Sequence, residues 1–336
     1  RQIHKTLLTK HKDVLIIDHH PGEFPEHPNL AVLNPHTNGL NGAKDVSASG
    51  AAYMVVENLD LKFRPLLSLA IIGAIGDRQE FFSGFTGIND VLVKRAVDLG
   101  LVELGEGLRL IGRSFRPVVE SLRTSTRPYL VGLSGKPTAC KSLLDSLDIR
   151  PSVPISRLDD EEEKALFDAI SSRVGPMSEK EEFMHTLWGT LYTDTSGKLG
   201  WPLVFREYAV ILDACGNLKR PEMGLAMLMG DKNAFDEATT LLNSRQEEML
   251  RVLEWFVKNL SRMKERSNFK FIDCGDDVKP AFVGEAVSLL IESGLLDMQK
   301  PIIALSRTPS KGLKVSARGT PALAMGGALS LIHISE

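Results

Sequence analysis

Short aliphatic runs and longer amphipathic stretches alternate along the chain. The run at 14–17 is entirely aliphatic, and Asp-His-His-Pro-Gly follows it at 18–22. A continuous apolar run that stops at a Pro-Gly breaker is typical of a strand buried on both faces of a parallel sheet. A second run of this kind, at 30–33, stops at Asn34-Pro35. The pattern therefore predicts an α/β fold built on a parallel sheet.

Helical spacing covers much of the remaining chain, and short apolar runs return near its C-terminus. The predicted helices cover residues 51–56, 66–75, 87–99, 206–216, 231–266 and 282–290, and the predicted strands cover 269–274, 301–305 and 313–317. Asp45 or Ser47 is predicted to cap the first of these helices, because a short side-chain oxygen accepts from the free N–H groups of a first turn. We also expect residues 1–12 to end a helix, and the acidic run at 159–163 to begin one with a solvated face.

The length of 336 residues predicts more than one domain. Residues 1–105 carry the first α/β pattern, and short helical runs broken by Pro and Gly at 106–185 indicate a helical connector. Residues 186–325 are predicted to form a smaller α/β domain. The tail at 326–336 continues neither pattern, and we expect it to be non-native.

Composition narrows the class of protein. Apolar residues make up 43% and charged residues 25% of the chain, as in ordinary globular proteins. The net charge of −3 argues against a broad surface that coats nucleic acid, but it allows a local basic groove. Three distant cysteines fit no metal or redox spacing and indicate free thiols in a reducing cytosol. No apolar run reaches a membrane span and no signal peptide opens the chain, so we expect a cytoplasmic protein without a membrane partner.

Polar side chains stand where the apolar elements end. Asp18, His19 and His20 follow the first strand, and functional groups in parallel sheets lie just past the carboxyl ends of strands. A carboxylate beside two imidazoles suits Mn²⁺, Zn²⁺ or Fe²⁺, and a plain surface turn is the alternative. Asp77 follows the most apolar helix, where a buried carboxylate needs water or a partner. His36 lies in a loop beside the predicted crevice.

These motifs resemble the DHH phosphoesterase superfamily. The Asp-His-His-Pro stretch after an aliphatic strand is similar to motif III of that family, and the segments 33–35, 45–50 and 73–77 agree with the family pattern downstream. The stretch at 206–216, Arg-Glu-Tyr-Ala-Val-Ile-Leu-Asp-Ala-Cys-Gly, resembles a segment of archaeal RecJ-like nucleases. The C-terminal part resembles a DHHA1 domain, with a Ser-x-Arg pattern at Ser316 and Arg318.

The resemblance implies a set of roles for the first domain. It implies catalytic roles for Asp18, His19, His20 and Asp77 around Mn²⁺ or Mg²⁺, with a two-metal site in the intact parent protein. His19 and Asp77 would be direct ligands, and Asp18 either a ligand or the partner that fixes an imidazole tautomer. His20 would contact the phosphate or the leaving oxygen.

Further contacts with the substrate are expected from other segments. Ser47, Ser49 and His36 are expected to contact phosphate, since a helix start can receive a phosphate oxygen. Ser316 and Arg318 share one face of a strand, and the resemblance implies that they hold a nucleic-acid backbone across an interdomain cleft. An ordinary surface arginine on an edge strand is the alternative for that pair.

The family pattern is incomplete in this sequence. A His-x-Asp-x-Asp first motif and a second-motif Asp, which supply ligands to both metals in the family, have no counterpart here. We therefore expect one or more βα units to precede the chain in the parent protein, and the 336-residue chain by itself to be inactive or nearly so.

The resemblance implies an exonuclease that hydrolyses phosphodiester bonds of single-stranded DNA or RNA with Mn²⁺ or Mg²⁺, in DNA replication or repair. Three alternatives remain open. The first is a phosphodiesterase or phosphatase of the same superfamily that acts on oligonucleotides or adenosine bisphosphate. The second is a non-catalytic replication scaffold that binds GINS and the replicative helicase. The third is an unrelated α/β metalloenzyme.

Overall fold

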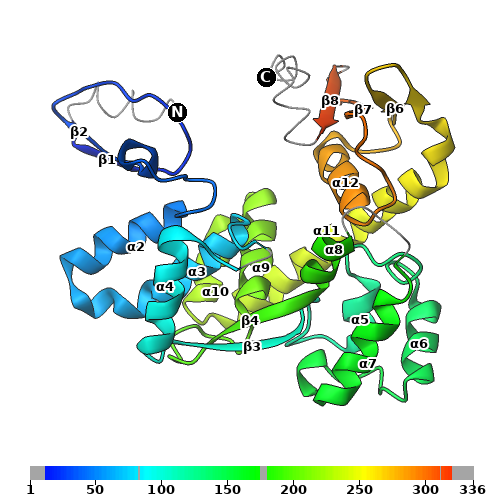
Figure 1. Ribbon diagram of the computed structural model, residues 1–336, viewed down its shortest axis with the longest axis horizontal. Coiled ribbons are helices and arrows are strands. Elements are labelled where there is room, and N and C mark those ends of the chain that lie inside the picture. Colours follow the sequence, from blue (N-terminus) through cyan, green and yellow to red (C-terminus); the bar gives the residue numbers. More distant parts are fainter. Residues whose placement is uncertain (1–11, 82–83, 175–179, 311, 320–336) are drawn as a thin grey trace. The chain divides into compact units, whose positions relative to one another are not determined.

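The computed structural model describes residues 12–81, 84–174, 180–310 and 312–319 (Figure 1). The predictions for residues 1–11 and for the tail at 326–336 lie outside these ranges. The elements are β1 (Val14–Ile17), β2 (Leu30–Leu33), the 3-10 helix η1 (Pro35–Asn38), α2 (Ala48–Leu59), η2 (Leu61–Leu66), α3 (Leu67–Gly76), α4 (Gly87–Asp98), β3 (Val102–Leu108), α5 (Val118–Arg123), α6 (Pro137–Ser146), η3 (Ile155–Arg157), α7 (Asp160–Ser171), α8 (Lys180–Leu187), β4 (Trp188–Asp194), α9 (Phe205–Asn217), α10 (Pro221–Leu228), α11 (Lys232–Asn259), η4 (Leu260–Arg262), β5 (Lys264–Glu265), β6 (Lys270–Asp273), α12 (Pro280–Glu292), β7 (Ile302–Arg307) and β8 (Leu313–Arg318). The prediction of an α/β fold is confirmed.

The chain divides into two compact units. The first consists of Arg1–Glu106 and Thr190–Thr239, and the second of Gly107–Gly189 and Thr240–Glu336. This division differs from the predicted boundary at residue 186, which placed α9 in the C-terminal domain. The structure packs α9 on α3 instead. α3 is almost wholly apolar, and such a helix must be covered by other elements on several sides.

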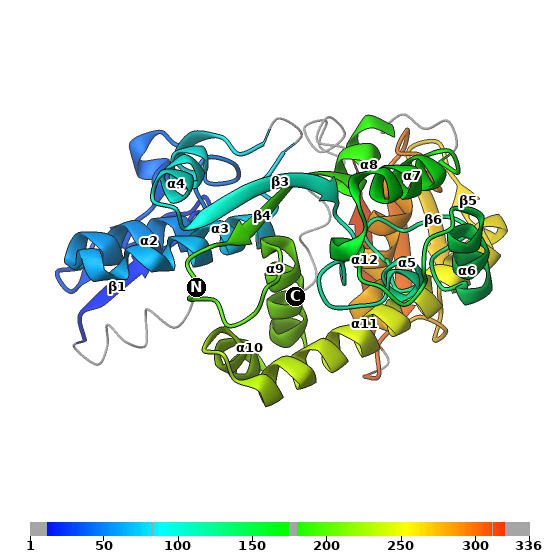
Figure 2. The same ribbon diagram turned by 90° about the horizontal axis from the view of Figure 1, so that it is seen from below.

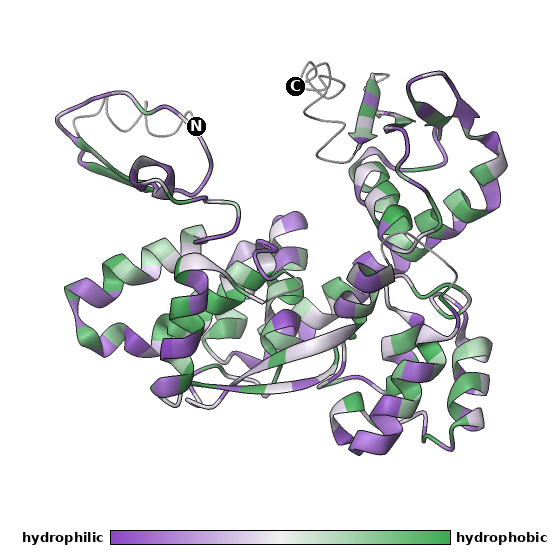
Figure 3. Cartoon of the chain, in the orientation of Figure 1, coloured by the Kyte–Doolittle hydropathy of each residue, from purple (hydrophilic) through white to green (hydrophobic). Residues whose placement is uncertain are grey.

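The first unit joins a short parallel sheet to a group of helices. β1 and β2 pair in parallel, with Ile17 opposite Leu33, so both strands deliver their following loops to the same edge. α2, α4 and α9 pack around α3, whose apolar character is visible in Figure 3. α3, the most apolar of the predicted helices, is also deeply buried, since most of its side chains are shielded from solvent.

Short helical runs were predicted for the connector at 106–185, and a strand, β3, was not expected where it begins. β3 pairs with β4, which lies some 80 residues later in the chain, as a two-stranded ribbon (Figure 2). The strand was missed because Gly105 and Gly107 lower its β propensity, and because its partner is remote in sequence. The helices α5, α6, α7 and α8 occupy the rest of the connector, as expected.

The acidic run begins α7, as predicted. Asp159 and Glu162 form a capping box, in which each side chain accepts from the other residue's backbone N–H. Its last member, Glu163, departs from the predicted solvated face. This carboxylate is buried, accepts from the Leu108 backbone N–H at 2.6 Å and pairs with Arg113.

The second unit contains a mixed four-stranded sheet in the order β5-β6-β7-β8. β6 and β7 run parallel, while the two outer pairs are antiparallel. α12 packs on β7 and β8, and one apolar cluster joins α11, α12 and the sheet, while the connector helices share a second cluster. α11 ends at Asn259, earlier than the predicted end at residue 266. Leu260 and Met263 lie beyond the helix but still pack on the same cluster, so their apolar spacing extended the predicted helix too far.

Candidate metal centre

Asp18 leaves β1 and organises the loop that follows. Its Oδ1 accepts from the backbone N–H groups of His19 at 2.8 Å and His20 at 3.2 Å, and from Nδ1 of the His20 ring at 2.8 Å. One carboxylate oxygen thus fixes both the backbone turn and the direction of an imidazole. Partial burial of Asp18 raises the pKa of its carboxyl, but the hydrogen bonds with His20 and His19 outweigh this, so the net pKa lies below the ordinary value.

His20 is exposed and presents its ring to solvent. Its side chain is 66% exposed, and the hydrogen bond to Asp18 occupies Nδ1. In a neutral ring a proton on Nδ1 leaves the Nε2 lone pair available. His20 therefore offers a nitrogen that can bind a metal or exchange a proton with a ligand.

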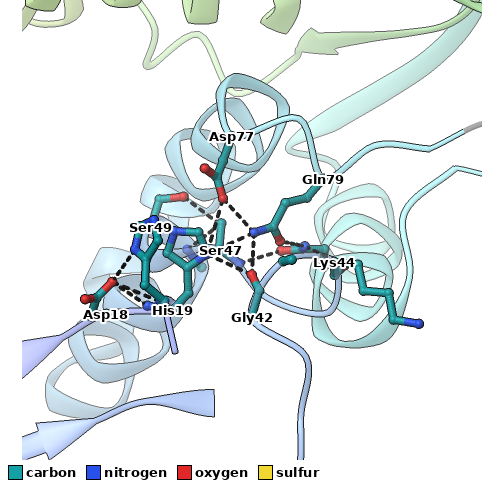
Figure 4. A network of polar contacts seen from close by, with 12 residues as sticks. Asp18, His19, Gly42, Lys44, Ser47, Ser49, Asp77 and Gln79 are labelled. Carbon is teal, nitrogen blue, oxygen red and sulfur yellow. Dashed lines mark hydrogen bonds and ion pairs between the residues drawn. The ribbon is translucent and has the colours of Figure 1, made fainter. Parts of the chain in front are cut away.

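His19 is buried and faces a different set of partners (Figure 4). Its Nδ1 lies 2.8 Å from the Gly42 carbonyl oxygen, 3.2 Å from Nε2 of Gln79 and 3.3 Å from Oδ2 of Asp77. The rings of His19 and His20 lie with their centroids 4.3 Å apart. The chain thus brings Asp77 to His19. The expected role of Asp77 as a direct metal ligand stays a prediction, because the converging ligand atoms belong to Asp18, His19 and His20.

The end of α3 explains how Asp77 reaches this place. The Gln79 N–H bonds to the Ala74 carbonyl and the Arg78 N–H to the Ile75 carbonyl, both at 3.0 Å. This pair of bonds is a Schellman motif, and it requires a left-handed residue directly after the helix cap. Arg78 takes that conformation with φ of 57°, so Asp77 and Gln79 turn toward the loop of His19.

Sequence reasoning missed two members of this site. Gln79 lies in a polar stretch just after Asp77 and carried no predicted role, but its side chain is fully buried. Gly42 was not singled out at all, although a Cβ on it would lie 1.8 Å from the His19 carbonyl oxygen. The Asn41-Gly42 dipeptide marks a turn, and no local signal shows that this turn lies against the histidines.

We refer to Asp18, His19, His20, Gly42, Asp77 and Gln79 as the histidine site. Within it, ligand atoms of Asp18, His19 and His20 all lie within 4.8 Å of one another. Hydrogen bonds occupy Nδ1 of both rings, so Nε2 is the nitrogen of each ring that remains for a ligand. A donor set of one carboxylate and two imidazoles is one that Mn²⁺, Zn²⁺ or Fe²⁺ accepts. Asp77 contacts the Nδ1 side of His19, where a carboxylate orients the ring.

The residues expected to contact phosphate have different surroundings. Ser47 is buried and caps α2, its Oγ accepting from Gly50 N–H at 3.1 Å, which confirms the predicted cap. Ser49 donates to the Ala70 carbonyl at 3.0 Å, so both hydroxyls take part in holding α2 on α3. His36 is exposed in η1, and its Nε2 would lie 3.0 Å from a Cβ on Gly42, next to the histidine site.

The second unit holds the predicted pair of residues on β8. Ser316 and Arg318 share one face, as expected, and that face meets α12: a Cβ on Gly284 would contact the Ser316 Oγ at 2.5 Å and the Arg318 Nη2 at 2.7 Å. Arg318 donates from Nε to the Ser288 Oγ at 2.7 Å and from Nη1 to the Ser316 Oγ at 3.3 Å. Ser316 is buried and Arg318 half-buried, so the pair is partly used by the fold.

The stretch at 206–216 has a structural role in the first unit. Arg206 donates to Glu80 at 2.9 Å, and the Tyr192 hydroxyl donates to the same carboxylate at 3.2 Å. Glu80 is nearly buried, with 5% of its side chain exposed. Since Glu80 follows Gln79 directly, this stretch anchors the segment that carries Asp77.

Within the described part of the chain, none of the helices is long and apolar enough to cross a membrane. No protein-family model matches the chain. It is 30% identical over 167 residues, 48% of its length, to the uncharacterized protein MJ0831 of Methanocaldococcus jannaschii, of which the match spans 37%. The structure is similar to the crystal structure of CDC45 from Entamoeba histolytica, with a TM-score of 0.61, 10% identity and coverage of 95% of this chain and 72% of that one. The chain therefore has an α/β fold that is also seen in CDC45.

Proposed function

We propose that the histidine site binds Mn²⁺ or Mg²⁺, and that the protein hydrolyses phosphodiester bonds of single-stranded DNA or RNA as an exonuclease of the archaeal RecJ-like type. One observation carries the proposal: the ligand atoms of Asp18, His19 and His20 converge within 4.8 Å of one another. The DHH-type motif and the fold shared with CDC45 support the same superfamily. The chain spans little more than a third of MJ0831, so the proposal concerns the whole protein.

The burial and the contacts of these side chains indicate a separate role for each in the proposed site. His19, Asp18 and His20 would hold the metal, and Asp77 would keep the His19 ring in place through its Nδ1 contact at 3.3 Å. A bound divalent ion supplies a more acidic water and neutralises charge on the phosphate. His20 is the exposed ligand, so the phosphate would approach the metal from its side; this takes the place of the direct phosphate contact expected from the resemblance, because Nε2 is its one remaining nitrogen.

Two peripheral groups would bind the strand. Arg318 would offer Nη2 to a phosphate oxygen, since its hydrogen bonds within the described residues use Nε and Nη1, and hydrogen bonds between a guanidinium and a phosphate are strong because both groups are charged. His36 would contact a phosphate beside Gly42. These contacts would not depend on base sequence, because phosphate contacts carry no sequence information and the sequence shows no motif that reads bases.

The test uses 5′- and 3′-labelled single strands and duplex with Mn²⁺ or EDTA. It compares the whole protein with its Asp77→Ala variant and an exposed control, Asp98→Ala. We expect Mn²⁺-dependent shortening of single strands by the whole protein, lost in Asp77→Ala and retained in the control. Equal shortening by Asp77→Ala would refute the assignment. Exclusive turnover of 5-mers over 30-mers would favour a small-substrate phosphodiesterase.

A second candidate is a non-catalytic replication scaffold, which the fold similarity to CDC45 favours. In that case the partners would be GINS and components of the replicative helicase, as in the scaffold relatives of the DHH family. The same experiment separates the two functions. A single strand that is bound but never shortened, together with no Mn²⁺ uptake, would move the assignment to the scaffold.

A further inference from the structure

Gln79 has more hydrogen-bond acceptors around its amide nitrogen than it has protons. Nε2 lies 2.6 Å from Oδ2 of Asp77, 2.8 Å from the Gly42 carbonyl oxygen and 3.2 Å from Nδ1 of His19. An amide group has two N–H donors, and the two shorter contacts take them. Nδ1 of His19 is therefore left to donate its own proton to the Gly42 oxygen, 2.8 Å away.

The direction of the Gln79 amide is set by backbone groups at both ends of a chain of hydrogen bonds. The Ser47 backbone N–H can only donate, and it lies 3.3 Å from Oδ1 of Asn89. This turns Nδ2 of Asn89 toward the Gln79 oxygen, at 2.6 Å. At the far end the Gly42 carbonyl can only accept, so it meets the Gln79 nitrogen. The polarity of the network follows from these two backbone groups.

Burial makes this arrangement stiff. Gln79 is 0% and Asn89 2% exposed, and a buried polar group that loses its partner destabilises the fold. A flipped Gln79 amide would place its oxygen against the Asp77 carboxylate and the Gly42 carbonyl, and would place its nitrogen against the Asn89 donor. The native direction is thus favoured at each contact.

We propose that Gln79 is a positioning residue of the histidine site, which holds the Asp77 carboxylate and the Gly42 loop against His19, with Asn89 of α4 fixing its direction. This inference rests on the proposed function, since it concerns how that site is held in place for a metal. The contacts with Gln79 and His19 hold Oδ2 of Asp77 on the Nδ1 side of the His19 ring. Nε2 of His19 is then the ring nitrogen that remains for a metal.

The first experiment needs no metal. In the metal-free 336-residue chain, the Gln79 side-chain amide protons are followed by hydrogen exchange in NMR spectra, with Gln299 of an exposed turn as the reference. We expect exchange at least 100-fold slower than for Gln299, and much faster exchange in Asn89→Leu. Exchange of Gln79 as fast as that of Gln299 would overturn the geometry behind the proposal.

The second experiment measures Mn²⁺ affinity by electron paramagnetic resonance, with unfolding midpoints recorded in EDTA. Gln79→Met removes the hydrogen bonds at similar volume, and Gln246→Met is the matched control, because Gln246 is also buried and lies in the second unit. We expect Gln79→Met to weaken Mn²⁺ binding about 10- to 100-fold, and Gln246→Met to lower only the midpoint. The double variant with Asn89→Leu should be no weaker than Gln79→Met alone, since the two residues act as one unit.

The outcomes separate the two claims. If folded Gln79→Met binds Mn²⁺ as tightly as the unsubstituted protein does, the positioning role is wrong and the proposed metal site still stands. If the unsubstituted protein binds no Mn²⁺, the proposed function fails. The exchange experiment alone then decides whether Gln79 holds Asp77 and the Gly42 loop.

Discussion

The histidine site and the Ser316–Arg318 pair were both predicted from a short motif beside a strand, and the structure treats them differently. In the histidine site, the buried Gly42 carbonyl contacts Nδ1 of His19 and the half-buried Asp18 contacts Nδ1 of His20, which leaves Nε2 of each ring for a ligand. On β8, Arg318 and Ser316 bond to each other and to Ser288 of α12. A motif indicates chemistry when the fold leaves its reactive atoms unused, and it indicates packing when the fold uses them.

Gly42→Ala is expected to have the largest effect on this comparison. Its Cβ would meet the His19 carbonyl oxygen at 1.8 Å, so the loop must move, which destabilises by about 1–3 kcal/mol and should abolish Mn²⁺ binding. Gly216→Ala is the control: it lies in α9 with open space around it and should stabilise by about 0.5–1 kcal/mol. Denaturant unfolding and Mn²⁺ titration measure both. Unchanged Mn²⁺ affinity in Gly42→Ala would show that this contact does not shape the site.

Replacement of Arg78 tests the turn that delivers Asp77. Arg78 has φ of 57°, a conformation that costs L-residues about 1–2 kcal/mol and glycine little. Arg78→Gly should therefore keep both the turn and the Mn²⁺ affinity. Arg78→Val should lower the stability and weaken Mn²⁺ binding. Unfolding midpoints in EDTA and Mn²⁺ titrations give the answer. Equal affinities for Mn²⁺ in the two variants would show that the conformation of this turn does not affect the metal site.

Arg318→Ala examines the other side of the comparison. Loss of its bonds to Ser288 and Ser316 should cost about 1 kcal/mol of stability. If the guanidinium also meets a phosphate, the slope of log affinity for a single strand against log salt should fall by about 0.7. Fluorescence anisotropy of a labelled 30-mer at several salt concentrations measures the slope. A stability loss without any change in slope would make the β8 pair purely structural.

Asp18→Asn is expected to have the smallest effect on the stability of the metal-free protein, and this effect concerns acid pH. The folded pKa of Asp18 lies below its ordinary value of 3.8, so the carboxylate contributes stability above that value, and this contribution is lost as pH falls through the folded pKa. The variant should thus lose less stability between neutral pH and about pH 3 than the parent does. Urea unfolding in EDTA at each pH gives the two curves. Parallel curves would mean that the Asp18 bonds contribute little.

Much of the first unit could be read from the sequence because its signals are local. The aliphatic runs at β1 and β2, the Ser47 cap and the apolar α3 all depend on residues close together in the chain. Hydrophobic periodicity and capping act over one or two turns, so a sequence displays them directly. The β3–β4 ribbon and the place of α9 depend on partners far along the chain, and they were missed for that reason.

For the candidate site, the sequence by itself determined the ligand-type residues Asp18, His19, His20 and Asp77, since each follows directly on an apolar element. Only the tertiary structure decided what surrounds them. Gly42, Gln79 and Asn89 carry no chemical signature of their own, and they matter because a close backbone approach and a fixed run of hydrogen bonds bring them to His19. Such contacts join residues 10 to 60 positions apart, and short-range patterns in a sequence do not record them.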